Sequence, residues 1–499
     1  MAEERETAKL IRSSWTNNNS EGRNRSVDRL SSLPNDILIG IISHLPLRLA
    51  IVTGSLSRRW RGLWTNTTSI DITPDDIDKL YKLDTINLLK VDTAFKEIIK
   101  QITSPFIDRF RLEFDKLFYI LVPSMDTLIR EICDRNIHEL KVMCPYTRSD
   151  MSIVPSVIFQ TRSLVSLELG STYDRCWEFP DDCSETIHLP NLKKLILTFA
   201  ATRLQWIEKL LNACPSLEEL SLTCEIDSGP LQSLKCSNKN LRWLLIKFDF
   251  MEINSVSIKA PKLEYLDISA PKSATFFFEE EPIMLREAKI KFTDEENGLM
   301  SKFYEAISNV TFLTLNVSKI DNLPRVFRNA TRLTLDMNVS YTLKTMSSIL
   351  EMCPLLDVLT LNVMDIGKDN EQSLCPLPVN VSNLPRSLKR IQIEIYNCCK
   401  PAKCFLDLVA YLLKFIPNLE HFNLSVQGCQ HWLAGDVERK EVRELMLCKL
   451  LYRCPMISKG CDVEFKGRYL KMSRKDGPKA WIPNGQVINF RPSPLKYFT

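Results

Sequence analysis

The sequence predicts an α/β fold in which a short three-helix module precedes a solenoid of strand-and-helix repeats, a curved parallel sheet with helices on its convex side. Two observations favour this fold. Short segments in which Leu or Ile alternates with another residue recur along most of the chain, and apolar stripes at helical spacing lie between several of them. With 499 residues, 44% of them hydrophobic, the chain can bury a large core, which excludes a largely disordered or collagen-like protein.

The alternating segments repeat at spacings of 20 to 32 residues, around the range of leucine-rich repeats. Alternation puts two apolar side chains of each segment on one face of a short strand, and a single strand cannot bury that face alone. Stacked neighbours bury it together, so the period predicts one long solenoid in place of the several domains that the length alone suggests. The predicted strands are centred near Leu112, Val142, Leu169, Leu197, Leu222, Ile246, Ile268, Ile290, Leu315, Leu335, Leu361, Ile393 and Leu424.

Helices are predicted between some of these strands, each ending shortly before a proline. In the first of them an apolar stripe begins at Leu204 and stops before Pro215. Because the order of helix, Cys or Ile, Pro and strand occurs four times, one structural position is shared by Cys214, Cys353, Ile416 and Cys454. A position that accepts Ile indicates a buried apolar side chain, so we expect these thiols to pack in the core and not to bind metal.

A compact apolar module precedes the repeats and spans residues 28–64. Its first helix is predicted to begin at Pro34 and to end at Pro46, its second to cover residues 49–56, and its third to be capped by Ser57. A module this short is below the size at which a domain usually folds alone. We therefore expect it to need a partner.

The module resembles the plant F-box. Its opening, DRLSSLPNDIL, and its close, LSRRWRGLW, match that family in residue type and spacing, and Leu-Pro recurs between them. In the family, a small Skp-type adaptor of cullin-based ubiquitin ligases docks on the F-box, and the remainder of the chain selects the substrate. Some of the motif's apolar side chains could instead hold the three helices together. The resemblance implies that the adaptor-facing residues are Leu33, Pro34, Ile37, Leu38, Ile41, Leu45, Pro46, Leu56 and Trp60.

A second resemblance lies in the C-terminal third. Residues 384–426 are similar to the region called FBD, which follows the F-box and leucine-rich repeats in many plant proteins, and a helix and strand within residues 441–465 complete it. The predicted organisation, in chain order, is a disordered N-terminal segment (1–27), the F-box (28–75), leucine-rich repeats (104–380), an FBD region that continues the solenoid (381–465) and a basic tail (466–499).

The net charge of +4 is too small to indicate a nucleic-acid-binding protein, but it is unevenly distributed. Residues 466–499 carry eight basic residues and one acid, a charge of +7, which leaves −3 for the rest of the chain. We interpret this tail as a solvated terminal segment; the alternative is a contact with nucleic acid or a nuclear address. The sequence shows neither a signal peptide nor an apolar run of membrane-spanning length, so we expect a soluble protein of the cytoplasm, the nucleus or both.

No residue pattern indicates catalysis, a cofactor or a metal site. The five His residues stand apart, and neither a Gly-rich phosphate loop nor a nucleophile motif occurs. The segment nearest to a thiolate cluster, with Cys398, Cys399 and Cys404, lacks a second Cys pair or a His nearby. We therefore expect a non-catalytic protein with no metal and no cofactor.

The outward positions of the predicted strands are mostly polar, with four exceptions from neighbouring repeats. These would form an apolar patch with aromatic anchors on the concave face, which is typical of an interaction hot spot. Alternatively, a neighbouring segment such as SATFFFEEEP folds over them. The predicted substrate-binding residues are Ile196, Trp243, Leu245 and Tyr265.

Together, the repeats and the resemblance favour a substrate-recognition subunit of a Skp-cullin-F-box ubiquitin ligase. The F-box would dock the Skp-type adaptor, and through it a cullin, while the repeats bind an unknown target protein. Two alternatives stay open. A small molecule could attach the target to the repeats, or the chain could be an adaptor-independent scaffold or nucleic-acid-associated protein that uses its basic tail.

Overall fold

The fold is that of a computed structural model, which forms two compact units, Met1–Leu217 and Glu218–Thr499. The predicted N-terminal segment, 1–27, lies outside the described residues. The structure describes residues 30, 32–73, 97–113, 122–143, 152–170, 177–178, 187–199, 204–224, 232–248, 253–271, 274–292, 301–317, 327–337, 343–363, 385–396, 403–426, 437–454, 456–458, 460–468, 470–476, 479–481 and 487–489.

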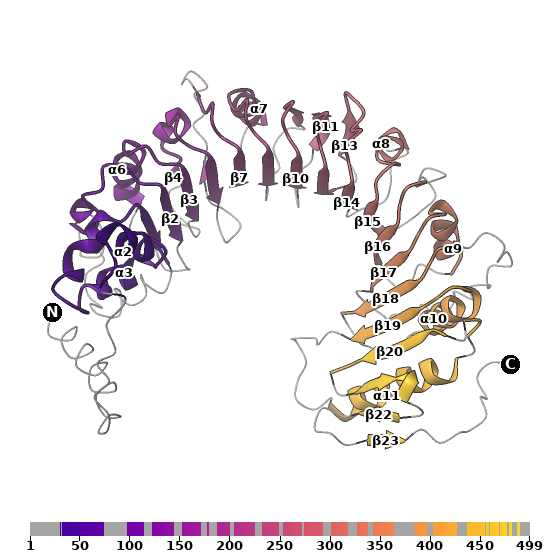
Figure 1. Ribbon diagram of the computed structural model, residues 1–499. Helices are drawn as coiled ribbons and strands as arrows, with labels where there is room; N and C mark the ends of the chain where they lie inside the picture. Colours follow the sequence, from indigo (N-terminus) through magenta and orange to yellow (C-terminus); the bar gives the residue numbers. More distant parts are fainter. Residues whose placement is uncertain are drawn as a thin grey trace, which may run out of the picture. The chain divides into compact units, whose positions relative to one another are not determined.

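The described part of the first unit begins with three short helices, at the indigo end of the chain in Figure 1. Pro34 occupies the N-cap position of the first helix, and Pro46 that of the second. Proline suits these positions because it cannot donate a backbone hydrogen bond, and the first backbone N–H groups of a helix have no partner within it. The three predicted helical elements are observed, as α2 (Asn35–Ile42), α3 (Leu47–Thr53) and the 3-10 helix η1 (Trp60–Asn66). The predicted cap is wrong, because Arg59 and not Ser57 occupies the N-cap position of η1, and α3 begins and ends earlier than the predicted 49–56.

A parallel sheet follows in the same unit, and its strands are stacked in chain order. Side chains alternate along each strand between the covered interior and the surface, as in β2, where Phe110 and Leu112 are buried. The sheet consists of β1 (Ser69–Ile72), β2 (Arg109–Glu113), β3 (Glu139–Met143), β5 (Ser166–Gly170) and β7 (Lys194–Phe199). The connections contain α6 (Val122–Cys133), η2 (Ser156–Gln160), α7 (Leu204–Asn212) and a small sheet of β4 (Ser152–Ile153) and β6 (Trp177–Glu178).

The second unit contains a longer parallel sheet, again stacked in chain order. The register is constant, so that Leu313, Leu333, Leu359 and Ile391 are neighbours in one buried row. Its strands are β8 (Glu219–Cys224), β10 (Trp243–Phe248), β12 (Tyr265–Ala270), β14 (Glu287–Phe292), β15 (Phe312–Val317), β16 (Arg332–Met337), β17 (Val358–Val363), β18 (Arg390–Ile395), β19 (His421–Val426) and β20 (Asp462–Lys466).

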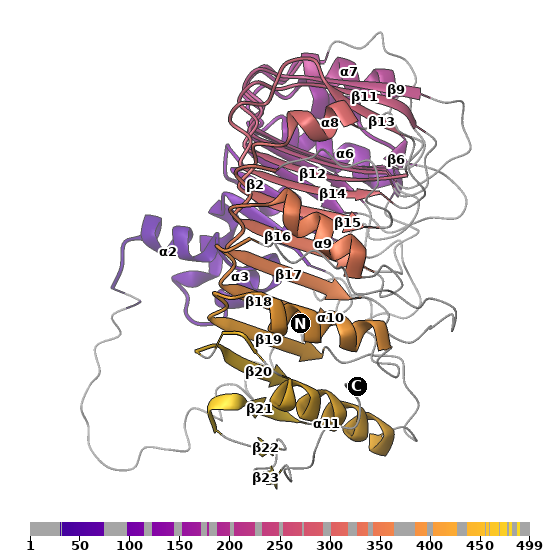
Figure 2. The same cartoon turned by 90° about the vertical axis from the view of Figure 1, so that its right-hand side faces the viewer.

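Helices cover one face of this sheet, and we call the other face the open face. Seen from the side, α9, α10 and α11 lie across the strands that they connect (Figure 2). The buried Leu and Ile side chains point to the covered face, as the repeat pattern predicts. The helices of the second unit are α8 (Ser301–Ala306), α9 (Leu343–Met352), α10 (Lys403–Phe415) and α11 (Val437–Arg453).

A second parallel sheet of three strands, which the sequence reading missed, lies on the helix side of the first repeats of this unit (Figure 1). Its apolar side chains complete the core; Phe276 packs on Phe292 and Phe303, with ring centroids 5.9 and 6.1 Å away. In these repeats the three-stranded sheet takes the place that helices occupy elsewhere. These repeats are shorter than the repeats on either side of them. Its strands are β9 (Gln232–Ser237), β11 (Ile253–Lys259) and β13 (Thr275–Phe278).

The predicted basic tail is folded into short strands over part of its described residues, and the side chains of Lys466, Lys471 and Lys475 are exposed. Residues 471–473 form an antiparallel strand on β20, and the side chain of Lys475 pairs with Asp462 at 2.7 Å. Arg474 donates a hydrogen bond to the carbonyl of Cys454 at 3.2 Å. The pairing with β20 was not predicted, whereas the side chains of Lys471 and Lys475 are exposed, as expected of a solvated segment. The last elements of the described residues are β21 (Lys471–Ser473), the 3-10 helix η5 (Arg474–Asp476), β22 (Lys479–Trp481) and β23 (Val487–Asn489).

The structure thus has the predicted α/β architecture of repeats with a long parallel sheet and helices, and a strand occurs at every one of the thirteen predicted centres. The chain adds β1 before the first of them. Of the described helices, none has the length and apolar character that a membrane crossing requires.

Candidate interaction surfaces

The helical module exposes an apolar patch on α2, α3 and the turn that follows them. Ile37 and Ile41 are one helical turn apart on α2 and are 51% and 41% exposed. Leu49 and Val52 of α3 and Leu56 after it are similarly exposed. We call these five residues, Ile37, Ile41, Leu49, Val52 and Leu56, the module patch. Such a group of large apolar side chains on one small module is typical of an interaction surface.

Two of the predicted adaptor-facing residues lie inside the module. Leu38 is fully buried and Trp60 is only 3% exposed, so neither presents a surface, and for these two the structure corrects the prediction. The cause is helical geometry, since neighbouring residues on a helix point about 100° apart, which separates Leu38 from Ile37. Contact with an adaptor stays a prediction for the exposed Pro34, Ile37, Ile41 and Leu56 and for the half-buried Leu33, Leu45 and Pro46.

Polar contacts hold the module in shape behind this patch. The guanidinium of Arg59 donates to Asn35 Oδ1 at 2.8 and 3.0 Å and to the carbonyl of Leu33, which ties η1 to the start of α2. At the other end of α2, the hydroxyls of Ser43 and Thr67 share a buried hydrogen bond of 2.9 Å. The patch therefore stands on a framework fixed at both ends of α2.

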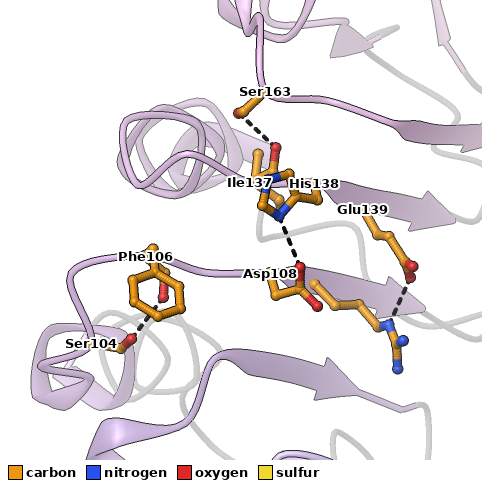
Figure 3. A network of polar contacts seen from close by, with 8 residues as sticks. Ser104, Phe106, Asp108, Ile137, His138, Glu139 and Ser163 are labelled. Carbon is orange, nitrogen blue, oxygen red and sulfur yellow. Dashed lines mark hydrogen bonds and ion pairs between the residues drawn. The ribbon is translucent and has the colours of Figure 1, made fainter. Parts of the chain in front are cut away.

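The strand starts of the first unit carry cross-strand polar pairs, which Figure 3 shows from close by. The guanidinium Nε of Arg109 donates to Glu139 Oε2 at 2.7 Å, and the two residues are direct neighbours in the register of β2 and β3. His138 Nδ1 lies 2.8 Å from Asp108 Oδ1. The predicted Ile196 belongs to this unit and is half-buried on β7. The Arg109–Glu139 and His138–Asp108 pairs are exposed, and each joins the starts of the neighbouring strands β2 and β3.

The strand starts of the second unit carry aromatic rings instead. Trp243 and Tyr265 are neighbours in the register of β10 and β12, and their rings stack with centroids 3.5 Å apart at 14°. Stacking buries Tyr265 to 8% exposure, while Trp243 stays 43% exposed. The prediction that these two side chains share the open face is confirmed, and the predicted Leu245 follows on the same face, half-buried.

These two rings line a hollow of about 360 Å³ together with Phe312 of β15. The wall also holds four carboxylates, from Glu218, Glu219, Glu264 and Glu287, and two guanidiniums. We call this site the aromatic hollow. Phe312 was missed by the sequence reading, although it stands two residues before the outward Thr314 and therefore faces the same way.

A lysine and an arginine of the chain lie over two of the rings of the aromatic hollow. The Nζ of Lys289 lies 5.0 Å from the ring centroid of Tyr265, and the guanidinium carbon of Arg332 lies 5.0 Å from that of Phe312. Burial raises the pKa of the Tyr265 hydroxyl. Burial by itself would lower the pKa of Lys289, but hydrogen bonds with Tyr265 and Glu287 outweigh it, and the pKa is raised. Lys289 is therefore held as a cation.

The segment that could have covered the aromatic patch does not do so. Residues 275–278 of SATFFFEEEP form β13 in the three-stranded sheet, where Phe278 stacks on Phe303 of α8 with centroids 5.6 Å apart. This overturns the alternative that SATFFFEEEP folds over the aromatic residues. Trp243 is left exposed on the open face.

Farther along the open face, polar side chains satisfy one another. Asp336 of β16 pairs with Lys291 at 2.5 Å and accepts a hydrogen bond from Asn362 at 2.7 Å, which links β14, β16 and β17. Threonines occupy the row beside them, at Thr314, Thr334 and Thr360. Among the described aromatic side chains of the open face, Trp243 is 43% exposed, while the 37% exposed Tyr396 after β18 donates a hydrogen bond to Glu394 at 2.8 Å.

The repeated cysteine position is apolar core, as predicted. Cys214, Cys353 and Cys454 are buried, like Ile416 in the fourth copy, and burial raises the pKa of the Cys214 and Cys353 thiols to about 12. Cys398 and Cys399 lie outside the described residues. Cys404 lies in α10, and its side chain is not described.

Both the helical module and the repeats match known protein families. Residues 30–69 match the F-box domain family, and residues 125–276 match the family described as "FBD-associated F-box protein At5g56370, LRR repeats". The chain carries an F-box and FBD-associated leucine-rich repeats. The recognition made from the motifs is therefore confirmed, and the helical module is from here on the F-box.

Relatives from Arabidopsis thaliana extend the similarity over most of the chain. The F-box/FBD/LRR-repeat protein At5g22660 is 26% identical over 480 residues, which cover 88% of this chain and 97% of the relative. The F-box/FBD/LRR-repeat protein At5g22700 is 25% identical, covering 88% and 98%. F-box/LRR-repeat protein 13 is 27% identical, covering 80% of this chain and 90% of its own. The boundaries predicted for the FBD region stay a prediction.

Proposed function

We propose that this chain is the substrate-recognition subunit of a Skp-cullin-F-box ubiquitin ligase, acting in the cytoplasm or the nucleus. The observation that carries the proposal is the module patch, because it exposes five large apolar side chains within the F-box. A Skp-type adaptor would bury this patch and link the chain to a cullin. The open face of the repeats would hold the target protein.

The chain's part in this mechanism is non-catalytic. One polypeptide that binds both adaptor and target keeps the target near the ubiquitin-charged enzyme, so the transfer gains from a high effective concentration. This requires a rigid link between the F-box and the repeats. Within the first unit such a link is supported by β1, which follows the F-box and pairs with β2, and by the N–H groups of Thr103 and Asp108, which donate to the carbonyls of Thr65 and Thr68 at 2.7 Å.

A binding assay with purified Skp-type adaptor tests the proposal. We expect the double variant Ile37→Ser with Leu56→Ser to bind at least about tenfold more weakly than the wild type, since central apolar anchors dominate protein interfaces. Both side chains are more than half exposed, so the fold should be retained.

The matched control is Leu355→Ser, because Leu355 is 55% exposed but lies in the second unit. It should bind the adaptor like the wild type. A folded wild-type protein that does not bind, or a double variant that binds equally well, would show that the module patch has another role. Trp60→Ala is not a suitable test, since a buried Trp that is removed weakens the fold itself.

A further inference from the structure

A cluster of arginines lies around the starts of β16, β17 and β18, which are side by side in Figure 2. Arg332 of β16 and Arg390 of β18 stand in one row of the register, with Val358 of β17 between them. Arg328 and Arg386 lie in the turns that lead into β16 and β18. All four arginine side chains are exposed, and none of them forms an ion pair with another residue that the structure describes.

The turn before β17 adds an apolar side chain to this cluster. Leu355 lies in that turn and is 55% exposed. The hydroxyl of Ser387 donates to two carbonyls of the same turn, at 3.1 and 2.8 Å. The turn before β18, which holds Arg386, is therefore fixed beside Leu355. We call the following residues the arginine edge: Arg328, Arg332, Leu355, Arg386 and Arg390.

The charges around the arginine edge leave it positive. The three turns and strand starts together hold five basic side chains and one acid, the half-buried Asp357. One of the five, Lys389, pairs with Glu420 at 3.4 Å, which leaves the four arginines. The acids on the strands themselves, Asp336 and Glu394, stand four residues beyond Arg332 and Arg390, and each is bound to a neighbouring side chain. An acidic ligand therefore complements this surface.

We propose that the arginine edge binds a short acidic segment of the target protein, with an apolar side chain of that segment on Leu355. Arginine suits this role because its planar guanidinium can donate two hydrogen bonds to one carboxylate. Arg332 and Arg390 are two strand spacings, about 10 Å, apart, so carboxylates on either side of one apolar residue span them. This inference rests on the proposed function, since it names the chemistry of the target.

The limited width of the arginine edge favours a peptide over a nucleic acid. In the same row, Glu287 lies two strands before Arg332, and Asp462 lies two strands after Arg390. A nucleic-acid strand carries a phosphate about every 3.4 Å and would continue over these carboxylates. A short acidic peptide ends before it reaches them.

Titration calorimetry on the full-length chain tests the inference with two blocked peptides, Ac-Ser-Glu-Glu-Leu-Glu-Glu-Ser-NH2 and its version with glutamine in place of glutamate. We expect the acidic peptide to bind about tenfold or more tightly, because the glutamine peptide has the same shape without the charge. Its binding should weaken as salt is raised, since exposed charges are screened. A single-stranded oligothymidylate should bind more weakly than the acidic peptide.

Variants locate the site. The double variant Arg386→Gln with Arg390→Gln should weaken binding of the acidic peptide by roughly tenfold, and Leu355→Ser should weaken it by about threefold. The matched control is Lys302→Gln with Lys449→Gln, which removes the same charge from exposed side chains of α8 and α11. It should leave binding unchanged. All of these side chains are exposed, so the fold should be retained.

Several outcomes would overturn the inference. They are no binding of the acidic peptide, equal binding of the glutamine peptide, wild-type affinity in the double arginine variant, and an equal loss in the lysine control. Tighter binding of the oligothymidylate than of the acidic peptide would also overturn it. Adaptor binding keeps the two proposals apart. If the adaptor binds and the peptide does not, only the acidic-segment site fails; if the peptide binds and the adaptor does not, only the ligase role fails.

Discussion

One glycine and one glutamate fix the turn at the end of the parallel sheet. Glu444 of α11 is buried, and its two carboxylate oxygens accept hydrogen bonds from the backbone N–H groups of Arg468 and Leu470 at 3.0 and 2.8 Å. A Cβ atom at Gly467 would come within 2.1 Å of Glu444 Oε2 and 2.8 Å of Phe465 Cε1. Gly467 is therefore required by the carboxylate that caps the turn.

This geometry predicts that Gly467→Ala lowers the free energy of unfolding by about 2 kcal/mol, because the methyl group must displace the buried carboxylate from its two donors. Gly460→Ala is the matched control, since a Cβ there would meet nothing within 4 Å. Urea unfolding of both variants gives the comparison. Equal stabilities would mean that the turn adapts without losing the Glu444 hydrogen bonds.

The recurring element of helix, Cys or Ile, Pro and strand shows how far the sequence determines the fold. Leu and Ile at strand spacing located every predicted strand, because burial of one sheet face leaves a period of two in the sequence. The pattern could not reveal β1, which has four residues, or β11, where polar and apolar residues do not alternate strictly. The cysteine position was interpretable because Ile416 fills one of its copies.

The candidate surface residues could be predicted from the sequence only in part. Outward positions on a strand follow from alternation, so Trp243 and Tyr265 were placed on the right face. The stacking that buries Tyr265 depends on the register of two strands 22 residues apart, which no single repeat contains. Similarly, the F-box motif names Ile37 and Leu38 together, and only the packing of α2 separates the exposed residue from the buried one.

Buried thiols at this element predict a dependence of stability on pH. The Cys353 thiol has its pKa raised to about 12 by burial, from the ordinary value of 9.0. Because an unfolded thiol ionises first, the stabilisation from this group is full below pH 9 and is lost as the pH rises from 9 towards 12. The loss between pH 8 and pH 10 should be about 1 kcal/mol for each such thiol.

The test compares urea unfolding of the wild type and Cys353→Ala at pH 8 and pH 10 under reducing conditions. The variant starts less stable, because it leaves a cavity, but its stability should fall less over this interval. Other groups titrate equally in both proteins, so the difference isolates the thiol. Parallel losses in the two proteins would contradict a buried, neutral Cys353.

At the scale of the whole molecule, the ends of the repeats are capped in different ways. At the start of the first unit, β1 follows directly from the F-box and pairs with β2, and the N–H groups of Thr103 and Asp108 donate to the carbonyls of Thr65 and Thr68 at 2.7 Å. At the end of the second unit, antiparallel strands close the sheet. Repeat arrays need such caps, because a terminal repeat otherwise exposes its apolar core and its unpaired strand edge.

The F-box is therefore expected to stabilise the repeats as well as to dock an adaptor. Deleting residues 1–73 removes β1 with its buried Ile70 and Ile72, and exposes the edge of β2. Hydrogen exchange should then lose protection in residues 109–113 first and in residues 139–143 next, since each strand depends on its neighbour. The double variant of Ile37 and Leu56 should keep this protection while it loses the adaptor. Unchanged protection in the deletion variant would show that the repeats fold without their cap.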